Sequence, residues 1–149
     1  MARGRTEAEL AANRPTHPIR PPNRSRHALD GVNRRTRPDD RNSLVMPWVD
    51  MDRDTELIRL GYAERLPDNR YRINGRIYFV KGSEQGTLVP EHGDGVVSLH
   101  RAGMRALITI VKYGGYGGQA ERELLSDPNI SEADIETARS LFAQRTNRP

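Results

Sequence analysis

The residues whose types best suit chemistry are two histidines and two arginines in the second half of the chain. His92 lies in the loop Glu91-His92-Gly93-Asp94-Gly95, and His100 lies at the expected start of a long helix, beside Arg101 and Arg105. If these side chains converge, one imidazole can take the proton of an RNA 2′-hydroxyl and the other can protonate the leaving oxygen. The arginines then stabilise the pentavalent phosphate. This set predicts metal-independent RNA cleavage. The alternative is that the loop 91–95 is only a solvated turn and that His100 only marks the start of a helix, with no catalytic role for either.

Metal and cofactor sites are not expected. Glu91, His92 and Asp94 could ligate a metal, but neighbouring loop residues seldom converge, and no histidine pair has helical i, i+4 spacing. The chain has no cysteine, which excludes disulfides, thiolate zinc sites and cysteine nucleophiles. No nucleotide-binding or hydrolase motif is present, and the glycines of 112–118 follow a helix instead of preceding one. We expect 112–118 to be a helix end and hinge.

Positive charge is concentrated at the start of the chain. Residues 1–47 carry ten arginines and five acids, whereas 48–149 carry fourteen basic and fifteen acidic side chains. Six of the ten prolines precede Trp48, and all eight aromatic residues lie at or after it. Proline removes backbone donors, and a segment with few large apolar residues cannot offset the entropy of ordering. We therefore expect a disordered Arg/Pro-rich arm over 1–47, one domain over 48–145 and a tail over 146–149.

An arginine-rich arm suits nucleic acid, because guanidinium groups bind phosphate bidentately and stack on bases. The densest basic stretch is Arg34, Arg35 and Arg37. The five interspersed acids favour the alternative, a solvated tail that binds nothing. The candidate nucleic-acid-binding residues are Arg20, Arg24, Arg26, Arg34, Arg35, Arg37 and Arg41.

Local patterns predict an α+β domain after the arm. Asp50 or Asp52 can cap a helix that ends at Gly61. Asn74-Gly75 is a strong hairpin signal, because both residues tolerate positive φ. The expected strands are Tyr62–Leu66, Arg70–Ile73, Arg76–Lys81, Thr87–Val89 and Val96–Leu99, with a turn over 82–86 and a loop over 90–95. They predict a small antiparallel sheet of three to five strands with helices packed on one face.

The C-terminal third is expected to be helical. Met104, Leu107, Ile108 and Val111 have the spacing of a buried helix face, in a helix that starts near His100 and ends at Gly114. A shorter helix is expected over 119–126. Ser131 followed by Asp134 forms a capping box for the last helix.

The segment Leu57–Ile73 resembles the end of a recognition helix that runs into the wing of winged-helix DNA-binding domains. This resemblance implies DNA binding, but where winged helices have two further helices upstream this chain has the proline-rich segment. The resemblance therefore assigns no functional residue in this chain. The α+β build without a catalytic motif is also shared by small toxin domains with ribonuclease activity.

Three functions follow as hypotheses, and whether the protein is an enzyme stays open. The first is a small nucleic-acid-associated accessory or regulatory protein that binds the phosphate backbone of RNA or DNA through the basic arm. The second is a metal-independent ribonuclease of stand-alone toxin type. The third is a protein-interaction module whose acidic helix face, with Glu132, Asp134 and Glu136, meets a protein partner. No apolar run is long enough for a membrane span and no signal-peptide core precedes Leu10, so we expect a cytoplasmic protein.

Overall fold

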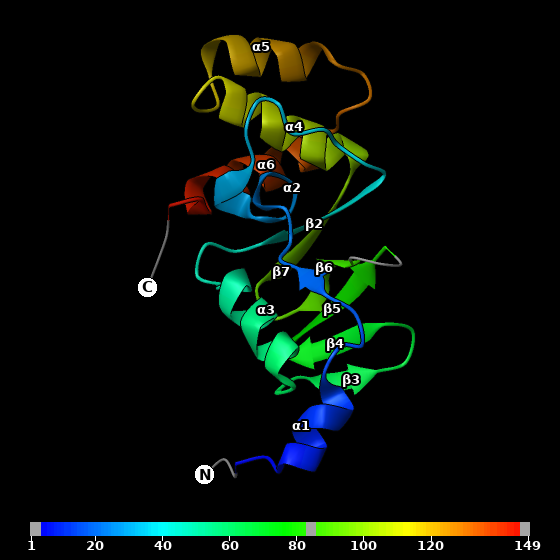
Figure 1. Ribbon diagram of the computed structural model, residues 1–149. Coiled ribbons are helices and arrows are strands. Elements are labelled where there is room, and N and C mark those ends of the chain that lie inside the picture. The colour runs from blue at the N-terminus through cyan, green and yellow to red at the C-terminus, as the bar shows by residue number, and fades with distance from the viewer. Residues whose placement is uncertain (1–3, 83–85, 147–149) are drawn as a thin grey trace. The chain divides into compact units, whose positions relative to one another are not determined.

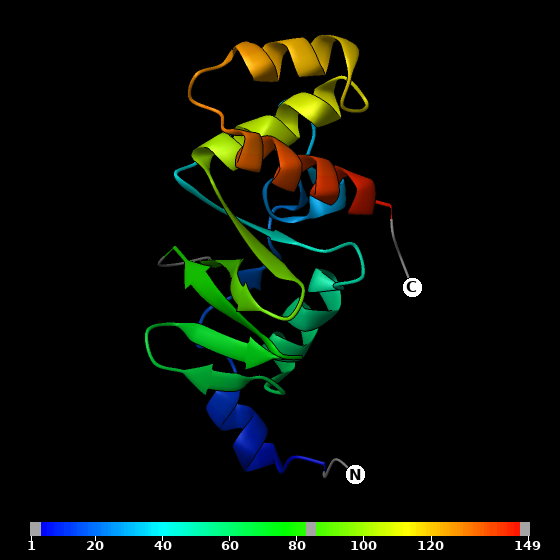
Figure 2. The same ribbon diagram turned by 180° about the vertical axis from the view of Figure 1, so that it is seen from behind.

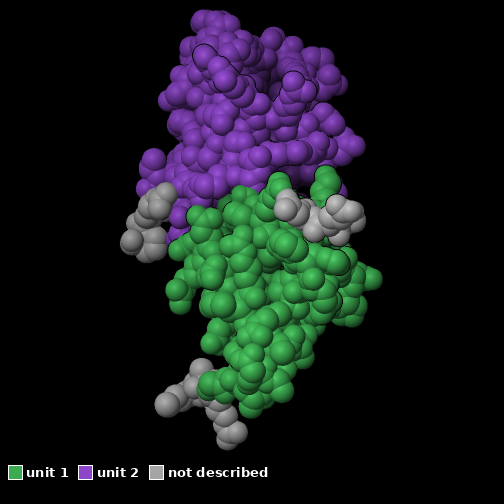
Figure 3. All heavy atoms as spheres, viewed as in Figure 1, with its two compact units in different colours: residues 1–22, 50–96 green, residues 23–49, 97–149 purple. Residues whose placement is uncertain are grey.

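The computed structural model describes residues 4–82 and 86–146. The chain divides into two compact units, each made of two segments (Figure 3). Unit 1 comprises residues 1–22 and 50–96, and unit 2 comprises residues 23–49 and 97–149. The predicted turn over 82–86 and the predicted tail over 146–149 lie mostly outside the described residues.

Unit 1 contains a five-stranded sheet with the order β1-β6-β5-β4-β3 (Figure 1). All neighbouring strands are antiparallel except β1, which pairs in parallel with β6 through Ile19 and Arg20. The predicted antiparallel sheet is confirmed for β3 to β6. It is wrong at both ends, because β1 was not predicted and the predicted strand Val96–Leu99 pairs with β2 (Arg41–Val45) in a separate two-stranded sheet. Its strands are β1 Ile19–Arg20, β3 Glu64–Leu66, β4 Arg70–Ile73, β5 Arg76–Lys81 and β6 Gly86–Gly93.

The hairpin between β4 and β5 forms where the sequence predicts it. Asn74 and Gly75 have φ angles of 51° and 78°, and Ile73 pairs directly with Arg76. The prediction of a loop over 90–95 is wrong for its first residues, because strand β6 continues to Gly93. A register shift between Ile77 and Tyr78 accommodates Pro90 within the strand. Such a bulge tolerates a proline that a regular ladder would exclude.

The described residues of unit 1 form two helices. Helix α1 spans Glu7–Asn13, and helix α3 spans Met51–Leu60 beside the sheet (Figures 1 and 2). The predicted ends of α3 are confirmed, because the Asp50 side chain accepts a hydrogen bond from the Arg53 amide and Gly61 adopts a φ of 92°. The Leu10 backbone comes so close to Gly61 that any side chain there would clash.

A buried polar cluster joins α3 to the sheet. Asp54 is 1% exposed and accepts hydrogen bonds from Asn74 Nδ2 at 2.8 Å, Arg76 Nη2 at 2.8 Å and the Tyr78 hydroxyl. Burial, and then the Asp54 carboxylate, raise the pKa of Tyr78 above its usual range, so the phenol remains a donor. Every polar group of this cluster faces another, which is the arrangement that a buried charge requires.

Unit 2 combines a two-stranded sheet, β2 and β7, with four helices and a 3₁₀ turn (Figures 1 and 2). Its hydrophobic core brings Leu29, Val32 and Leu44 together with the buried face of α4. Met104 and Leu107 are buried as predicted, while Ile108 and Val111 are half-buried at the edge of the core. The elements are α2 Arg24–His27, η1 Leu29–Gly31, β2 Arg41–Val45, β7 Val96–His100, α4 Arg101–Lys112, α5 Gly118–Ser126 and α6 Glu132–Gln144.

The expected disorder of residues 1–47 is not supported. Residues 4–47 form α1, β1, α2, η1 and β2, and both units take up part of them. Leu29, Val32 and Leu44 lie fully buried in the core of unit 2, although they are sparse in sequence. They become ordered because later segments supply most of the apolar surface that they contact, so a low local hydrophobicity does not imply disorder. The α+β class itself is confirmed.

Candidate functional site

A short turn in unit 2 presents two of the predicted phosphate-binding arginines. The Thr36 amide donates to the Asn33 carbonyl at 3.0 Å, and the Arg35 amide donates to Asn33 Oδ1 at 2.8 Å. The buried Thr36 hydroxyl donates to the carbonyl of Ser25 at 2.8 Å, which ties the turn to α2. Arg34 and Arg35 therefore occupy the two central positions of an anchored turn, with exposed side chains.

The acids close to this turn in sequence are occupied by other arginines. Asp30 accepts a hydrogen bond from Arg24 at 2.7 Å, and Asp39 forms an ion pair with Arg26. Asp40, the third of them, pairs with the helical Arg101 at 3.0 Å. The candidates Arg24 and Arg26 are thus already neutralised.

Four of the seven candidate arginines keep their charge uncompensated. They are exposed, and within the described residues their guanidinium groups make no hydrogen bond or ion pair. We call this set the arginine group, and its members are Arg34, Arg35, Arg37 and Arg41. The remaining candidate, Arg20, lies in β1 of unit 1 and is not part of it.

The net charge of the protein belongs entirely to unit 2. Its segments carry thirteen basic and nine acidic side chains, whereas those of unit 1 carry eleven of each. The stretch 23–49 alone contributes six arginines against three acids. The arginine group therefore lies in the unit whose long-range field already attracts anions.

The two candidate catalytic histidines lie in different units. His92 is exposed on β6 of unit 1, and its Nε2 is 3.6 Å from Glu91, which also accepts a bidentate bond from Arg70. His100 precedes α4 in unit 2. Neither unit assembles the acid and base pair by itself, so joint catalysis by the two histidines stays a prediction.

His100 has a carboxylate partner that the sequence reasoning did not identify. Its Nε2 lies 2.7 Å from Asp134 Oδ1, and the side chains of His100 and Asp134 are 66% and 11% exposed. Burial opposes the charge on Asp134, but hydrogen bonds from Ser131 and His100 outweigh it and lower the pKa of Asp134. A fixed carboxylate on one ring nitrogen orients an imidazole for proton transfer at the other. The sequence assigned Asp134 to the helix cap and to an acidic helix face, and the 34-residue separation gave no local signal for the contact with His100.

The candidate arginines beside His100 are held by carboxylates. Arg101 pairs with Asp40 at 3.0 Å, and Arg105 pairs with Asp127 at 2.8 Å. Stabilising a phosphate in a reaction would require these two ion pairs to open. In residues 4–82 and 86–146, no three histidine, aspartate or glutamate side chains are placed to hold a metal ion.

Comparison with known proteins gives no relative: no protein family, characterised protein or solved structure matches the chain. In the part of the chain that the structure describes, no helix has the length and apolar character needed to cross a membrane. Assignment of a function therefore depends on the contacts described above.

Proposed function

We propose that unit 2 binds the phosphate backbone of a single-stranded nucleic acid through the arginine group. The observation that carries this proposal is the uneven pairing of charge in residues 23–49. Arg24 and Arg26 are neutralised by carboxylates, while Arg34 and three neighbouring arginines have no partner among the described residues. Guanidinium groups without internal partners are available to form bidentate hydrogen bonds with phosphate.

An exposed tryptophan in the same unit favours single strands over duplexes. Trp48 is 47% exposed and follows β2, the strand that carries Arg41. A turn closed by the Val49 amide and the Met46 carbonyl at 3.0 Å holds it outside the core. Aromatic faces stack on unpaired bases, and this stacking adds sequence-tolerant affinity to the phosphate contacts.

The test is a fluorescence-anisotropy titration of the full chain with labelled single-stranded RNA, single-stranded DNA and duplex DNA over a range of salt concentrations. The double variant R34A/R35A is compared with R53A/R122A, which removes two exposed arginines outside the group. We expect R34A/R35A to weaken single-strand binding on the order of tenfold. Its salt slope should also fall by about 1.4, because each lost phosphate contact removes about 0.7.

The charge-matched control R53A/R122A separates specific contacts from net charge. If both double variants lose the same affinity, binding follows overall charge and the arginine group has no special role. Equal binding by R34A/R35A and the unmodified protein would refute the proposal. A clear preference for duplex DNA would refute the single-strand part of it.

The His100–Asp134 pair supports a second candidate, the metal-independent ribonuclease of toxin type. His100 is exposed and has an oriented ring, as a general base requires. The test is to incubate labelled RNA with the protein in chelator and to analyse its length. We expect shortened RNA with the unmodified protein and intact RNA with His100→Ala or His92→Ala. Intact RNA in every lane rejects this candidate.

The protein-interaction hypothesis needs one correction. Asp134 is buried at the start of α6, so it does not belong to an exposed acidic face. Glu132 and Glu136 remain exposed and line a hollow of about 240 Å³ together with Tyr116 and Arg139. The Arg139 guanidinium stacks on Tyr116 at 4.4 Å, so part of this face is occupied by the chain itself.

A further inference from the structure

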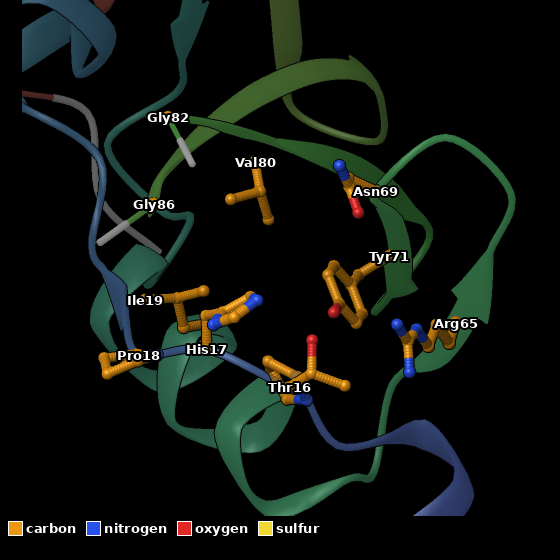
Figure 4. A pocket seen from close by; sticks show the side chains of 11 residues that line it. Thr16, His17, Pro18, Ile19, Arg65, Asn69, Tyr71, Val80, Gly82 and Gly86 are labelled. Atoms are coloured by element: carbon orange, nitrogen blue, oxygen red, sulfur yellow. The ribbon is translucent and has the colours of Figure 1, made fainter. Parts of the chain in front are cut away.

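A hollow in unit 1 has no part in the function proposed above. It has a volume of about 330 Å³ and lies between the segment 15–19 and the sheet (Figure 4). Ile19 of β1 and Arg65 of β3 both line it, although these strands are the two outer strands of the sheet. The sheet therefore curls so that its two edges flank one cavity, a common place for ligand sites in β structures.

The segment before β1 bridges the two edges of the sheet. Asn13 Oδ1 accepts a hydrogen bond from the Arg65 amide at 3.2 Å, and six residues later Ile19 pairs with Gly86 of β6. Arg59 fixes the far end of the segment by donating to the Ile19 carbonyl at 2.6 Å. The wall of the hollow is thus held by hydrogen bonds at both ends.

Tyr71 is the most informative residue of the hollow. Its side chain lines the cavity and is only 4% exposed, yet its hydroxyl has no hydrogen-bond partner among the described residues. Every fully enclosed polar side-chain atom in the described part has a partner, so this hydroxyl keeps its access to solvent through the cavity. The hydroxyl of Tyr71 is therefore available to a water molecule or to a ligand in the hollow.

The other polar residues of the hollow are exposed, and their side chains are also unpaired among the described residues. Figure 4 shows the Thr16 hydroxyl and the Tyr71 hydroxyl turned toward each other, with the Arg65 guanidinium beside them and the Asn69 amide across the cavity. His17 also points its ring into the hollow. Within the described residues none of these side chains has a hydrogen bond or ion pair, whereas the nearby Arg70 and Arg72 are paired with Glu91 and Glu64.

The described residues that line the hollow carry charge of one sign. Among its described lining residues Arg65 is a permanent cation, and no aspartate or glutamate is present. Burial raises the pKa of Tyr71, and the positive charge of Arg65 acts in the opposite direction. Tyr71 therefore remains protonated at neutral pH and can donate, and every donor in the hollow suits an oxyanion.

We propose that this hollow binds a small organic oxyanion, a phosphate monoester or a carboxylate, with Arg65 and the hydroxyls of Tyr71 and Thr16 on the anionic group. Ile19 and Val80 offer apolar contact to the body of the ligand. The volume of 330 Å³ limits the ligand to a compact molecule. This site is independent of the arginine group, which belongs to unit 2.

The test is isothermal titration calorimetry of the full chain with phenyl phosphate, benzoate and the uncharged probe benzyl alcohol. We expect saturable binding of one or both anions and none of the alcohol, and the stronger anion identifies the ligand class. Arg65→Ala should weaken binding at least tenfold. Tyr71→Phe should weaken it several-fold with an unchanged melting temperature, because the hydroxyl supports no contact within the described structure.

Arg53→Ala is the matched control, because Arg53 is an exposed arginine of unit 1 outside the hollow. It should bind both anions like the unmodified protein. The proposal is overturned if neither anion binds saturably, if the alcohol binds as well as the anions, or if Arg65→Ala and Arg53→Ala have equal effects. Retained affinity in Tyr71→Phe would also overturn it, because the phenol is one of the donors assigned to the anionic group.

Discussion

At the scale of single residues, the two units use charge in different ways. Asp54 and Arg76 are buried in unit 1 and fully paired, so they hold structure. Arg34 and Arg35 of unit 2 are exposed and unpaired within the described residues, so they are free for another molecule. Pairing therefore separates the structural charges from the charges proposed for binding more clearly than position in the sequence does.

The buried cluster leads to a prediction about stability. Asp54→Asn should lower the free energy of unfolding by about 3–5 kcal/mol, because Arg76 is left as a buried charge without a counterion. Tyr78→Phe should cost less, about 1–2 kcal/mol, because it removes one neutral donor. Urea denaturation followed by circular dichroism measures both. Asp52→Asn, on the exposed side of the same helix, is the control, and an equal loss there would contradict the argument.

At the scale of elements, local signals predicted the ends of helices and the tightest turn. Asp50 and Gly61 bound α3, and Asn74-Gly75 closes the hairpin, because these positions need a particular side chain or a positive φ. The strand β1 was not predictable in this way. Its two residues are ordered by pairing with β6, 67 positions later, and no local pattern encodes such a partner.

For the candidate sites too, the sequence carried a signal for residue type but not for contacts between distant segments. Arginine content made Arg34 and Arg35 candidate phosphate ligands, because residue type alone suggests that chemistry. Which arginines are neutralised depends on contacts such as Arg101 with Asp40, across 61 positions. The hollow around Tyr71 gave no sequence signal, because its wall and its floor come from segments that are far apart in the chain.

The start of α6 allows a prediction about pH. The hydrogen bonds of Ser131 and His100 hold the pKa of Asp134 below its ordinary value of 3.8. A carboxylate with a depressed pKa in the folded state adds stability above its unfolded pKa, and this stability is lost as the pH falls through the folded pKa. Asp134→Asn should therefore be less stable than the unmodified protein at pH 7. The difference should begin to shrink below about pH 4 and should disappear only below the lowered pKa of folded Asp134, where both side chains are neutral.

Thermal unfolding between pH 2.5 and 7 measures this difference. Ser131→Ala is a useful companion, because loss of the cap should cost about 1 kcal/mol. Glu136→Gln, at an exposed position of the same helix, is the control and should show no such pH dependence. If the stability difference between Asp134→Asn and the unmodified protein stays constant down to pH 2.5, the charge of Asp134 does not contribute to stability and the argument is wrong.

At the scale of the whole molecule, the chain passes between the two units three times, after residues 22, 49 and 96. Neither unit is therefore a continuous stretch of sequence. Deletion of residues 1–47 would remove β1 from unit 1 and β2 from unit 2 together with the arginine group. Loss of nucleic-acid binding by such a truncation would not identify the arginines, so point substitutions are the appropriate test.

The same architecture predicts that the first third of the chain contributes directly to stability. Leu29 is fully buried in the core of unit 2, whereas Leu125 of the same unit is 62% exposed. Leu29→Ala should lower the free energy of unfolding by about 2–5 kcal/mol, because it leaves a cavity among packed side chains. Leu125→Ala should change it by less than about 0.5 kcal/mol. Urea denaturation of the two variants measures both changes. If Leu29→Ala changes the free energy of unfolding as little as Leu125→Ala does, residues 1–47 behave as a disordered segment and the prediction is wrong.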